Sequence, residues 1–252
     1  MTDNVAIALV TGANKGIGFE IVRQLAGRGM TVFLSARNPA RRDQATAALR
    51  SDGLDVRPVA LDVTDSVSIE AAAAHVDAES GRLDVLVNNA GISSSGTGAG
   101  SPASANLDAV QAVFDTNVFG VLRVTNAMLP LLRRSPAARI VNISSGVGSM
   151  TYMTDPDHYM SRLPAVAAYP ASKAALNALT VQYAKELRAD GILVNAVAPG
   201  ACATDFTKNL GMTITRTAAD GAAIAVKLAT VGPDVPDAPT GGFFDHDGPV
   251  PW

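Results

Sequence analysis

Residues 5–18 decide the fold, and they read Val5-Ala6-Ile7-Ala8-Leu9-Val10-Thr11-Gly12-Ala13-Asn14-Lys15-Gly16-Ile17-Gly18. The first six form a short apolar run, as expected of a buried strand in a parallel sheet. Three glycines follow at the spacing Gly-x-x-x-Gly-x-Gly, and a helical pattern then runs over residues 19–28. This order lets backbone N–H groups at a helix N-terminus approach a pyrophosphate. We therefore predict a dinucleotide-binding loop, with contacts from Gly12, Asn14, Lys15, Gly16, Ile17 and Gly18.

Apolar runs and helical patterns alternate from this loop to the end of the chain. Further strands are expected at residues 31–35, 56–61, 83–87, 139–143, 192–197 and 242–245. Helices are expected at residues 40–50, 66–80, 107–134, 169–189 and 215–230, whereas 92–106 and 149–165 lack periodicity and are expected to be loops. The alternation predicts one α/β domain over residues 1–252, a Rossmann-type doubly wound parallel sheet of about seven strands with helices on both faces.

The composition disfavours several classes of partner. Only 17% of the 252 residues are charged, the formal net charge is −3, and no long basic run occurs, which argues against nucleic acid or an anionic membrane surface. The single cysteine, Cys202, excludes an intrachain disulfide and suits a reducing compartment. The first residues lack the basic region of a signal peptide, and no apolar run approaches the roughly 20 residues of a membrane-spanning helix. We expect a cytoplasmic protein with no nucleic-acid or membrane partner, and we identify no metal site.

Two basic residues indicate which dinucleotide binds. An NAD-binding unit usually carries an acidic residue about 20 positions after its glycine loop, where it holds the ribose 2′-hydroxyl. This chain has Arg37 there and Lys15 within the loop, which predicts a 2′-phosphate and hence NADP(H); the alternative is two solvated basic side chains. Asp62 and Val63 follow the strand expected at 56–61. Asp62 could accept a hydrogen bond from an adenine amino group, or it could cap the next turn.

The segment Tyr169-Pro170-Ala171-Ser172-Lys173 begins an expected helix, because Pro170 suits the first turn. Tyr169 and Lys173 are four residues apart and therefore share one helix face. A nearby ammonium lowers the pKa of a phenol from about 10 by favouring the phenolate, so this pair can form a usable acid/base. The alternative is a partly buried tyrosine and a solvated lysine on an ordinary amphipathic helix.

Several motifs in this order resemble those of the short-chain dehydrogenase/reductase family, and the resemblance covers nearly the whole chain. They are the glycine loop, Asn88-Asn89-Ala90-Gly91, Asn117, Ser145, Tyr169-x-x-x-Lys173 and Pro199-Gly200. Each is weak alone, since serines commonly end strands and a helical asparagine often bonds the backbone. Asn14-Lys15-Gly16 and the 24-residue spacing from Ser145 to Tyr169 are most similar to the carbonyl-reductase branch.

The resemblance implies a mechanism in which NADP(H) lies across the carboxyl ends of the strands and a hydride passes between nicotinamide and a carbonyl carbon. Ser145 would hydrogen-bond the carbonyl oxygen, Tyr169 would donate the proton, and Lys173 would lower the tyrosine pKa and bond the nicotinamide ribose. Asn117 would hold a water that links Lys173 to solvent, and Thr204 would bond the carboxamide. The other cofactor contacts implied are Asn89, Ala90, Gly91, Pro199 and Gly200.

Two other functions share some of these features. A nucleotide-sugar epimerase uses a related fold and the same Tyr/Lys pair, but usually with a different glycine spacing and a longer C-terminal substrate region. A catalytically silent NADP(H)-sensing or scaffold protein usually lacks one of the four candidate catalytic residues, and all four are present here. The apolar and methionine-containing segments 93–106, 149–165 and 201–217 favour a hydrophobic carbonyl or alcohol substrate, and we expect 149–165 to cover it. A monomer and a homo-oligomer are about equally expected.

Overall fold

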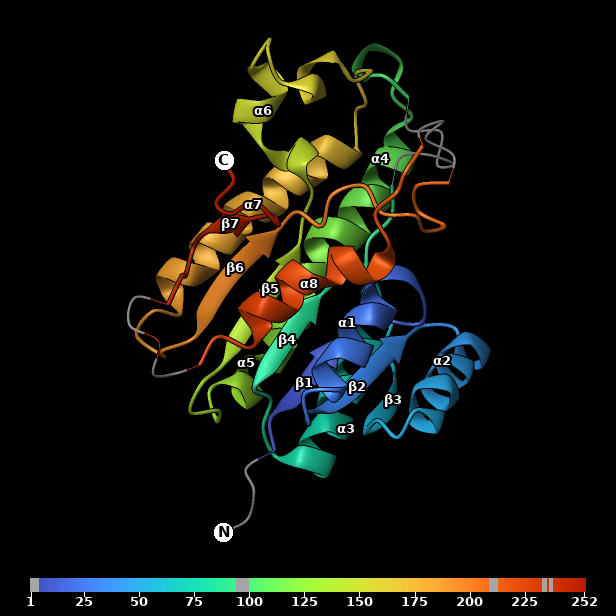
Figure 1. Cartoon of the computed structure of the whole chain (residues 1–252), viewed down its shortest axis with the longest axis vertical. Helices are drawn as coiled ribbons and strands as arrows, with labels where there is room; N and C mark the ends of the chain where they lie inside the picture. The colour runs from blue at the N-terminus through green and yellow to red at the C-terminus, as the bar shows by residue number, and fades with distance from the viewer. Residues whose placement is uncertain (1–4, 94–99, 209–212, 233–234, 236–237) are drawn as a thin grey trace.

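The sheet has the strand order of a doubly wound α/β fold. The computed structural model describes residues 5–93, 100–208, 213–232, 235 and 238–252. Within these residues every strand runs parallel to its neighbours, in the order β3-β2-β1-β4-β5-β6-β7 (Figure 1). The predicted fold class is therefore confirmed. The strands are β1 (Ile7–Val10), β2 (Thr31–Ala36), β3 (Val56–Ala60), β4 (Val85–Asn88), β5 (Arg139–Ile143), β6 (Leu193–Val197) and β7 (Phe243–Phe244).

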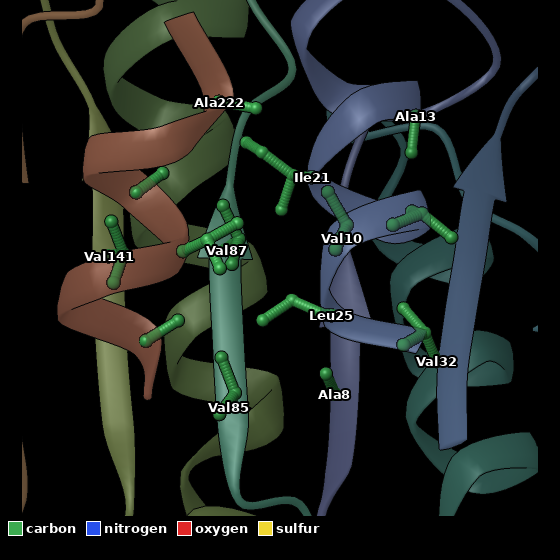
Figure 2. Close-up of a cluster of buried hydrophobic side chains, with 14 of the residues drawn as sticks. Ala8, Val10, Ala13, Ile21, Leu25, Val32, Val85, Val87, Val141 and Ala222 are labelled. Carbon is green, nitrogen blue, oxygen red and sulfur yellow. The ribbon is translucent and has the colours of Figure 1, made fainter. Parts of the chain in front are cut away.

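Helices cover both faces of the sheet. One layer contains α1 (Gly16–Ala26), α2 (Pro39–Ser51) and α8 (Ala218–Ala229), and the other contains α3 (Ser66–Ser80), α5 (Gly120–Leu132) and α7 (Tyr169–Glu186). In β1, Ala8 and Val10 pack into the first layer and Leu9 into the second. Figure 2 shows the first of these clusters, where the strands meet Ile21 of α1 and Ala222 of α8. Burial on both faces explains why the strands appear in the sequence as continuous apolar runs.

The strand order reverses between β1 and β4. The chain moves outward from β1 through β2 to β3, and then returns to β4 on the other side of β1. At such a switch point the two loops diverge and leave a crevice at the carboxyl ends of the strands. The glycine loop after β1 and the Asn89-Ala90-Gly91 segment after β4 adjoin there.

The helix expected at residues 107–134 is interrupted. α4 (Leu107–Phe114) continues into a π-helical segment, η2 (Asp115–Phe119), before α5 begins. Asn117 lies in this segment, is fully buried, and hydrogen-bonds the backbone of Ile92 in both directions. Single π-helical turns within α-helices are frequent at functional sites. The prediction of a single continuous helix is wrong in this respect.

Residues 149–165 contain more regular structure than predicted. α6 (Met150–Thr154) and the 3-10 helix η4 (Tyr159–Arg162) lie in this segment, and Ser149 Oγ caps α6 by accepting from Tyr152 N at 3.1 Å. Both helices are too short to produce a recognisable apolar period. Two more 3-10 turns are η1 (Pro102–Ser104) and η3 (Gly146–Gly148). Part of the loop expected at 92–106, residues 94–99, lies outside the described residues.

Among the described residues, no helix is both long enough and apolar enough to cross a membrane.

Candidate functional site

The glycine loop packs tightly against the segment that follows β4. Gly12 has a φ of +62°, and a Cβ there would lie 2.9 Å from Ala90 Cα, so only glycine fits. Asn89 holds the loop from the other side, because its Nδ2 donates to Thr11 O at 2.8 Å and to Gly12 O at 3.1 Å. Asn88 ties β4 to β5 by donating to Asn142 Oδ1 at 2.9 Å. The two amides therefore join neighbouring strand ends.

The N-terminus of α1 is suited to an anion. The helix begins at Gly16, its N-cap Lys15 makes no side-chain capping bond, and its first turn contains no acidic residue. The backbone N–H groups of a first helical turn have no partner within the helix, and the helix dipole adds positive potential. This geometry fits the predicted pyrophosphate contact.

The basic residues next to this loop do not all line one pocket. Lys15 forms an ion pair with Asp205, with 2.7 Å between Nζ and Oδ2. Lys15 also lines a pocket of about 470 Å³, and the other cation there is Arg41 of α2, not Arg37. Arg41 was not predicted, although it lies four residues after Arg37 and immediately within the helix that Asn38 caps. The other residues that line the pocket are Asn14, Phe19, Gln44, Ala45, Ala48 and Asp205.

Asp62 and Val63 have clear structural roles at the end of β3. Asp62 Oδ1 accepts from Thr64 N at 3.0 Å and from Thr64 Oγ1 at 2.7 Å, which is the turn-capping alternative. Burial works to raise the Asp62 pKa, but these hydrogen bonds and the charge of Arg37 outweigh it, and the pKa is lowered. Val63 is buried against α5, where a Cβ on Gly120 would lie 2.9 Å from its Cγ2. Arg37 thus lies close enough to Asp62 for its charge to lower the pKa of that carboxyl.

Ser145, Tyr169 and Lys173 come together at the carboxyl ends of β5 and β6. The Tyr169 hydroxyl is hydrogen-bonded to Ser145, and Lys173 Nζ lies 5.6 Å from the centroid of the Tyr169 ring. Lys173 is buried, and its Nζ donates to the carbonyl oxygen of Ile143 at 2.7 Å. A Cβ on Gly91 would lie 3.7 Å from the same Nζ, so the segment after β4 adjoins the lysine. The predicted shared face of Tyr169 and Lys173 is therefore confirmed.

The pKa of Tyr169 shifts in the direction opposite to the prediction. Burial raises it to about 12, and the hydrogen bond with Ser145 only partly opposes this. Burial also lowers the pKa of Lys173 to about 8. The physical reason is that loss of water disfavours both charged forms, while the ammonium is directed at the Ile143 carbonyl. Tyr169 is therefore protonated at neutral pH, as a proton donor must be.

Asn117 joins the segment after β4 to the first turn of α7. Its Nδ2 donates to Ile92 O at 2.9 Å and to Ser172 Oγ at 3.0 Å, and its Oδ1 accepts from Ile92 N at 2.9 Å. Ser172 Oγ in turn donates to Tyr169 O at 2.7 Å. Both Nδ2 protons are thus used in positioning neighbouring segments. The water-holding role of Asn117 remains a prediction.

Two apolar side chains approach the Ser145–Tyr169 pair from different segments. Met160 of η4 packs on Gly146, where an added Cβ would overlap its terminal methyl group. Phe206, which follows β6, is 41% exposed, and its ring centroid lies 5.6 Å from that of Tyr169. Figure 1 places α6 beyond the carboxyl ends of the strands. Met160 thus brings part of residues 149–165 against the turn that carries Ser145; that this segment covers the substrate stays a prediction.

The segment after β6 begins with Pro199 and Gly200 and returns to the glycine loop. Gly200 has a φ of +78° and turns the chain. Thr204 then lies beside the loop, because a Cβ on Gly16 would be 3.5 Å from its Cγ2. Cys202 is buried between them, and burial raises the pKa of its thiol, which fits a packing residue and not a nucleophile. Sequence reasoning missed Met160, Asp205 and Phe206 as individual site residues.

Comparison with known proteins agrees with this geometry. The family model described as short chain dehydrogenase matches residues 6–215. The chain is 37% identical to the short-chain dehydrogenase anuI of Penicillium roqueforti, over 90% of this chain and 89% of that protein. It is 35% identical to (-)-isopiperitenone reductase of Mentha piperita, over 95% and 96% of the two chains. The structure of NADPH-bound carbonyl reductase from chicken fatty liver superposes with a TM-score of 0.82 at 32% identity, over 98% and 99% of the chains. On these grounds the chain belongs to the short-chain dehydrogenase family.

Proposed function

We propose that this oxidoreductase uses NADP(H) to interconvert a carbonyl compound and a secondary alcohol, as carbonyl reductases do. The observation that carries the proposal is the hydrogen-bonded Ser145–Tyr169 pair, with buried Lys173 beside it. This group lies next to the segment that packs on the glycine loop. The similarity to an NADPH-bound carbonyl reductase supports both the reaction and the cofactor.

The residues present fit a phosphorylated dinucleotide. The N–H groups of the first turn of α1, which begins at Gly16, suit the pyrophosphate. Arg37, and Arg41 of the pocket beside Lys15, would supply guanidinium groups toward a 2′-phosphate. Asp62 and Val63 would bound the adenine, and Gly91, Tyr169 and Lys173 would bound the nicotinamide ribose. Asn89, Ala90, Pro199, Gly200 and Thr204 complete the proposed set. When bound, the dinucleotide supplies or takes up a hydride.

The protein groups then have distinct tasks. Ser145 Oγ donates a hydrogen bond to the substrate oxygen and stabilises its developing negative charge. Tyr169 transfers its proton to that oxygen, and Lys173 adds positive charge that favours this transfer. Asn117 positions Tyr169 through Ser172, and we retain the proposal that it also holds the water through which Tyr169 is reprotonated.

The substrate that fits best is hydrophobic. Met160 presents a thioether next to Gly146, and Phe206 presents an aromatic ring against Tyr169. A sugar would leave its hydroxyl groups without partners against these surfaces. These apolar surfaces suit small hydrophobic ketones or aldehydes as substrates. The single cysteine and the composition, which has no long basic run, suit an enzyme of the cytoplasm. A monomer and a homo-oligomer both remain compatible with it.

Consumption of NADPH in the presence of a panel of hydrophobic ketones and aldehydes tests the proposal. We expect steady, carbonyl-dependent oxidation of NADPH. A silent sensor or scaffold would bind NADPH without consuming it. A nucleotide-sugar epimerase would convert its substrate with no net oxidation of the dinucleotide.

Arg37→Ala is expected to weaken NADPH by about tenfold or more and to leave NADH nearly unchanged, because hydrogen bonds to charged groups are worth about 1.5–3 kcal/mol. Arg37→Asp should weaken NADPH further and improve NADH. The measurement is kcat/KM for both cofactors. Arg42→Ala is the matched control, because Arg42 lies nearby in sequence, on α2, and pairs with Asp43. Equal use of NADH and NADPH by the wild type, or unchanged NADPH kinetics in Arg37→Ala, would contradict the assignment.

Replacing residues 151–164 by a short linker is expected to change KM and the order of preference among ketones more than the affinity for NADPH. The reason is that this segment reaches the site through Met160, whereas the proposed dinucleotide contacts come from other segments. Met160→Ala is the smaller version of the same test. KM values measured on several ketones and the Kd of NADPH decide the matter. If a folded, shortened protein keeps the same kinetics throughout, the segment is only a spacer.

A further inference from the structure

An ion pair connects the glycine loop to the segment that follows β6. Lys15 and Asp205 are 190 residues apart in the sequence, and Lys15 Nζ lies 2.7 Å from Asp205 Oδ2. Both side chains are more than half exposed, so the pair contributes little to stability. The location of the pair is more relevant to cofactor binding, because Lys15 is the cation of the glycine loop and lies next to the proposed site of the dinucleotide phosphates.

Asp205 supplies the negative charge in an otherwise basic pocket. Among the described residues that line the 470 Å³ pocket, Lys15 and Arg41 are cationic and Asp205 alone is acidic. The hydrogen bond from Lys15, followed by the charges of Lys15, Lys208 and Arg41, lowers the pKa of Asp205. The carboxylate is therefore ionised at neutral pH, and it engages the type of donor that phosphate oxygens would engage.

The neighbours of Asp205 fix where this carboxylate lies. Thr204 contacts the glycine loop beside Gly16, and the Phe206 ring lies against Tyr169. Thr207 Oγ1 also donates to Thr204 O at 3.2 Å and braces the turn. The contacts of Thr204 and Phe206 hold the chain on both sides of Asp205, which keeps its carboxylate near Lys15.

We propose that Asp205 is a selectivity residue for the dinucleotide, an internal counter-ion that competes with the 2′-phosphate for Lys15 and so moderates the preference for NADPH. The inference rests on the proposed use of NADP(H). Its physical basis is that a 2′-phosphate carries about −2 charge, so it must displace the carboxylate from Lys15 and is repelled by it. NADH carries no such group and experiences less of this competition.

Asp205→Asn keeps the shape of the side chain and removes its charge. Isothermal titration of this variant should show a Kd for NADPH lower than that of the wild type by about three- to tenfold, with less than about a twofold change for NADH. The gain should shrink at about 0.5 M salt, where the screening length is roughly 4 Å. It should also shrink in a Lys15→Met background, because the carboxylate and the 2′-phosphate then have no common cation to compete for and only their direct repulsion remains.

Asp77→Asn is the matched control. Asp77 pairs with Arg134 at the same 2.7 Å distance and with similar exposure, but on α3, and its removal should leave both Kd values unchanged. The proposal is overturned if Asp205→Asn weakens NADPH, if it tightens both dinucleotides equally, or if its full gain persists with Lys15→Met. A wild type that binds NADH as tightly as NADPH would contradict only the proposed preference for NADP(H). The role of Asp205 would then still require that Asp205→Asn lowers the Kd for NADPH relative to the Kd for NADH.

Discussion

Tyr169→Phe is expected to lower kcat for carbonyl reduction by about 10²–10⁴-fold, the usual contribution of a general acid, while NADPH still binds. The substitution removes only the hydroxyl that is hydrogen-bonded to Ser145 and keeps the ring that packs against Phe206. With its pKa raised to about 12, this phenol holds its proton at neutral pH and can deliver it to the substrate oxygen. Phenylalanine has no proton to deliver.

Tyr183→Phe provides the control for this experiment. Tyr183 lies on the same helix, burial raises its pKa to about 12 as well, and its hydroxyl donates to Asn126 Oδ1 at 2.7 Å, away from the site. Its loss should leave kcat within a few-fold of the wild type. Measured kcat at saturating ketone and NADPH, together with the Kd of NADPH, separates catalysis from binding. A Tyr169→Phe enzyme that also stays within a few-fold would remove this tyrosine from the mechanism.

Ser145→Ala should lower kcat by about 10²-fold or more, because one preorganised donor to a developing oxyanion typically contributes that much. KM should change far less, since the hydrogen bond strengthens mainly as negative charge develops on the oxygen. The measurement is kcat and KM on one good ketone substrate at saturating NADPH.

Ser144→Ala offers a comparison one residue away. Ser144 is buried, and its Oγ donates to Asn177 Oδ1 at 2.6 Å, within the protein interior. Its removal should cost about 1 kcal/mol of unfolding free energy, with kcat nearly unchanged. If the two serine variants lose activity equally, Ser145 acts through the structure of the turn and not through the substrate oxygen.

The fold was predictable because its signals are local. The apolar run from Val5 to Val10 contains Ala8, Leu9 and Val10, which are buried on the two faces of the sheet, and such a run is visible without knowledge of its neighbours. The ends of β5 and of α3 fall where the sequence predicts them. The π-helical segment at Asn117 was not predictable, because its wide turn accommodates hydrogen bonds to Ile92 and Ser172, which the period of a helix does not encode.

The grouping of Tyr169 and Lys173 could be predicted from the sequence, whereas their pKa shifts and the ion pair of Lys15 could not. The four-residue spacing is enough to place Tyr169 and Lys173 on one face, yet the pKa of Tyr169 depends on burial by segments distant in the sequence. In the same way, Lys15 is visible as a cation, but its partner Asp205 lies 190 residues away. Arg41 could have been found by following the chain four residues beyond Arg37, into the first turn of the expected helix.

Hydride transfer can be measured directly with NADPH that carries deuterium at the reactive carbon of its nicotinamide. The wild-type protein should transfer this deuterium to the carbonyl carbon of at least one hydrophobic ketone or aldehyde, giving an alcohol one mass unit heavier. Tyr169→Phe, which still binds NADPH, should give almost none of this product. If NADPH binds but no carbonyl compound in the panel gains deuterium, the protein is not a carbonyl reductase and its Ser145–Tyr169–Lys173 group serves another purpose.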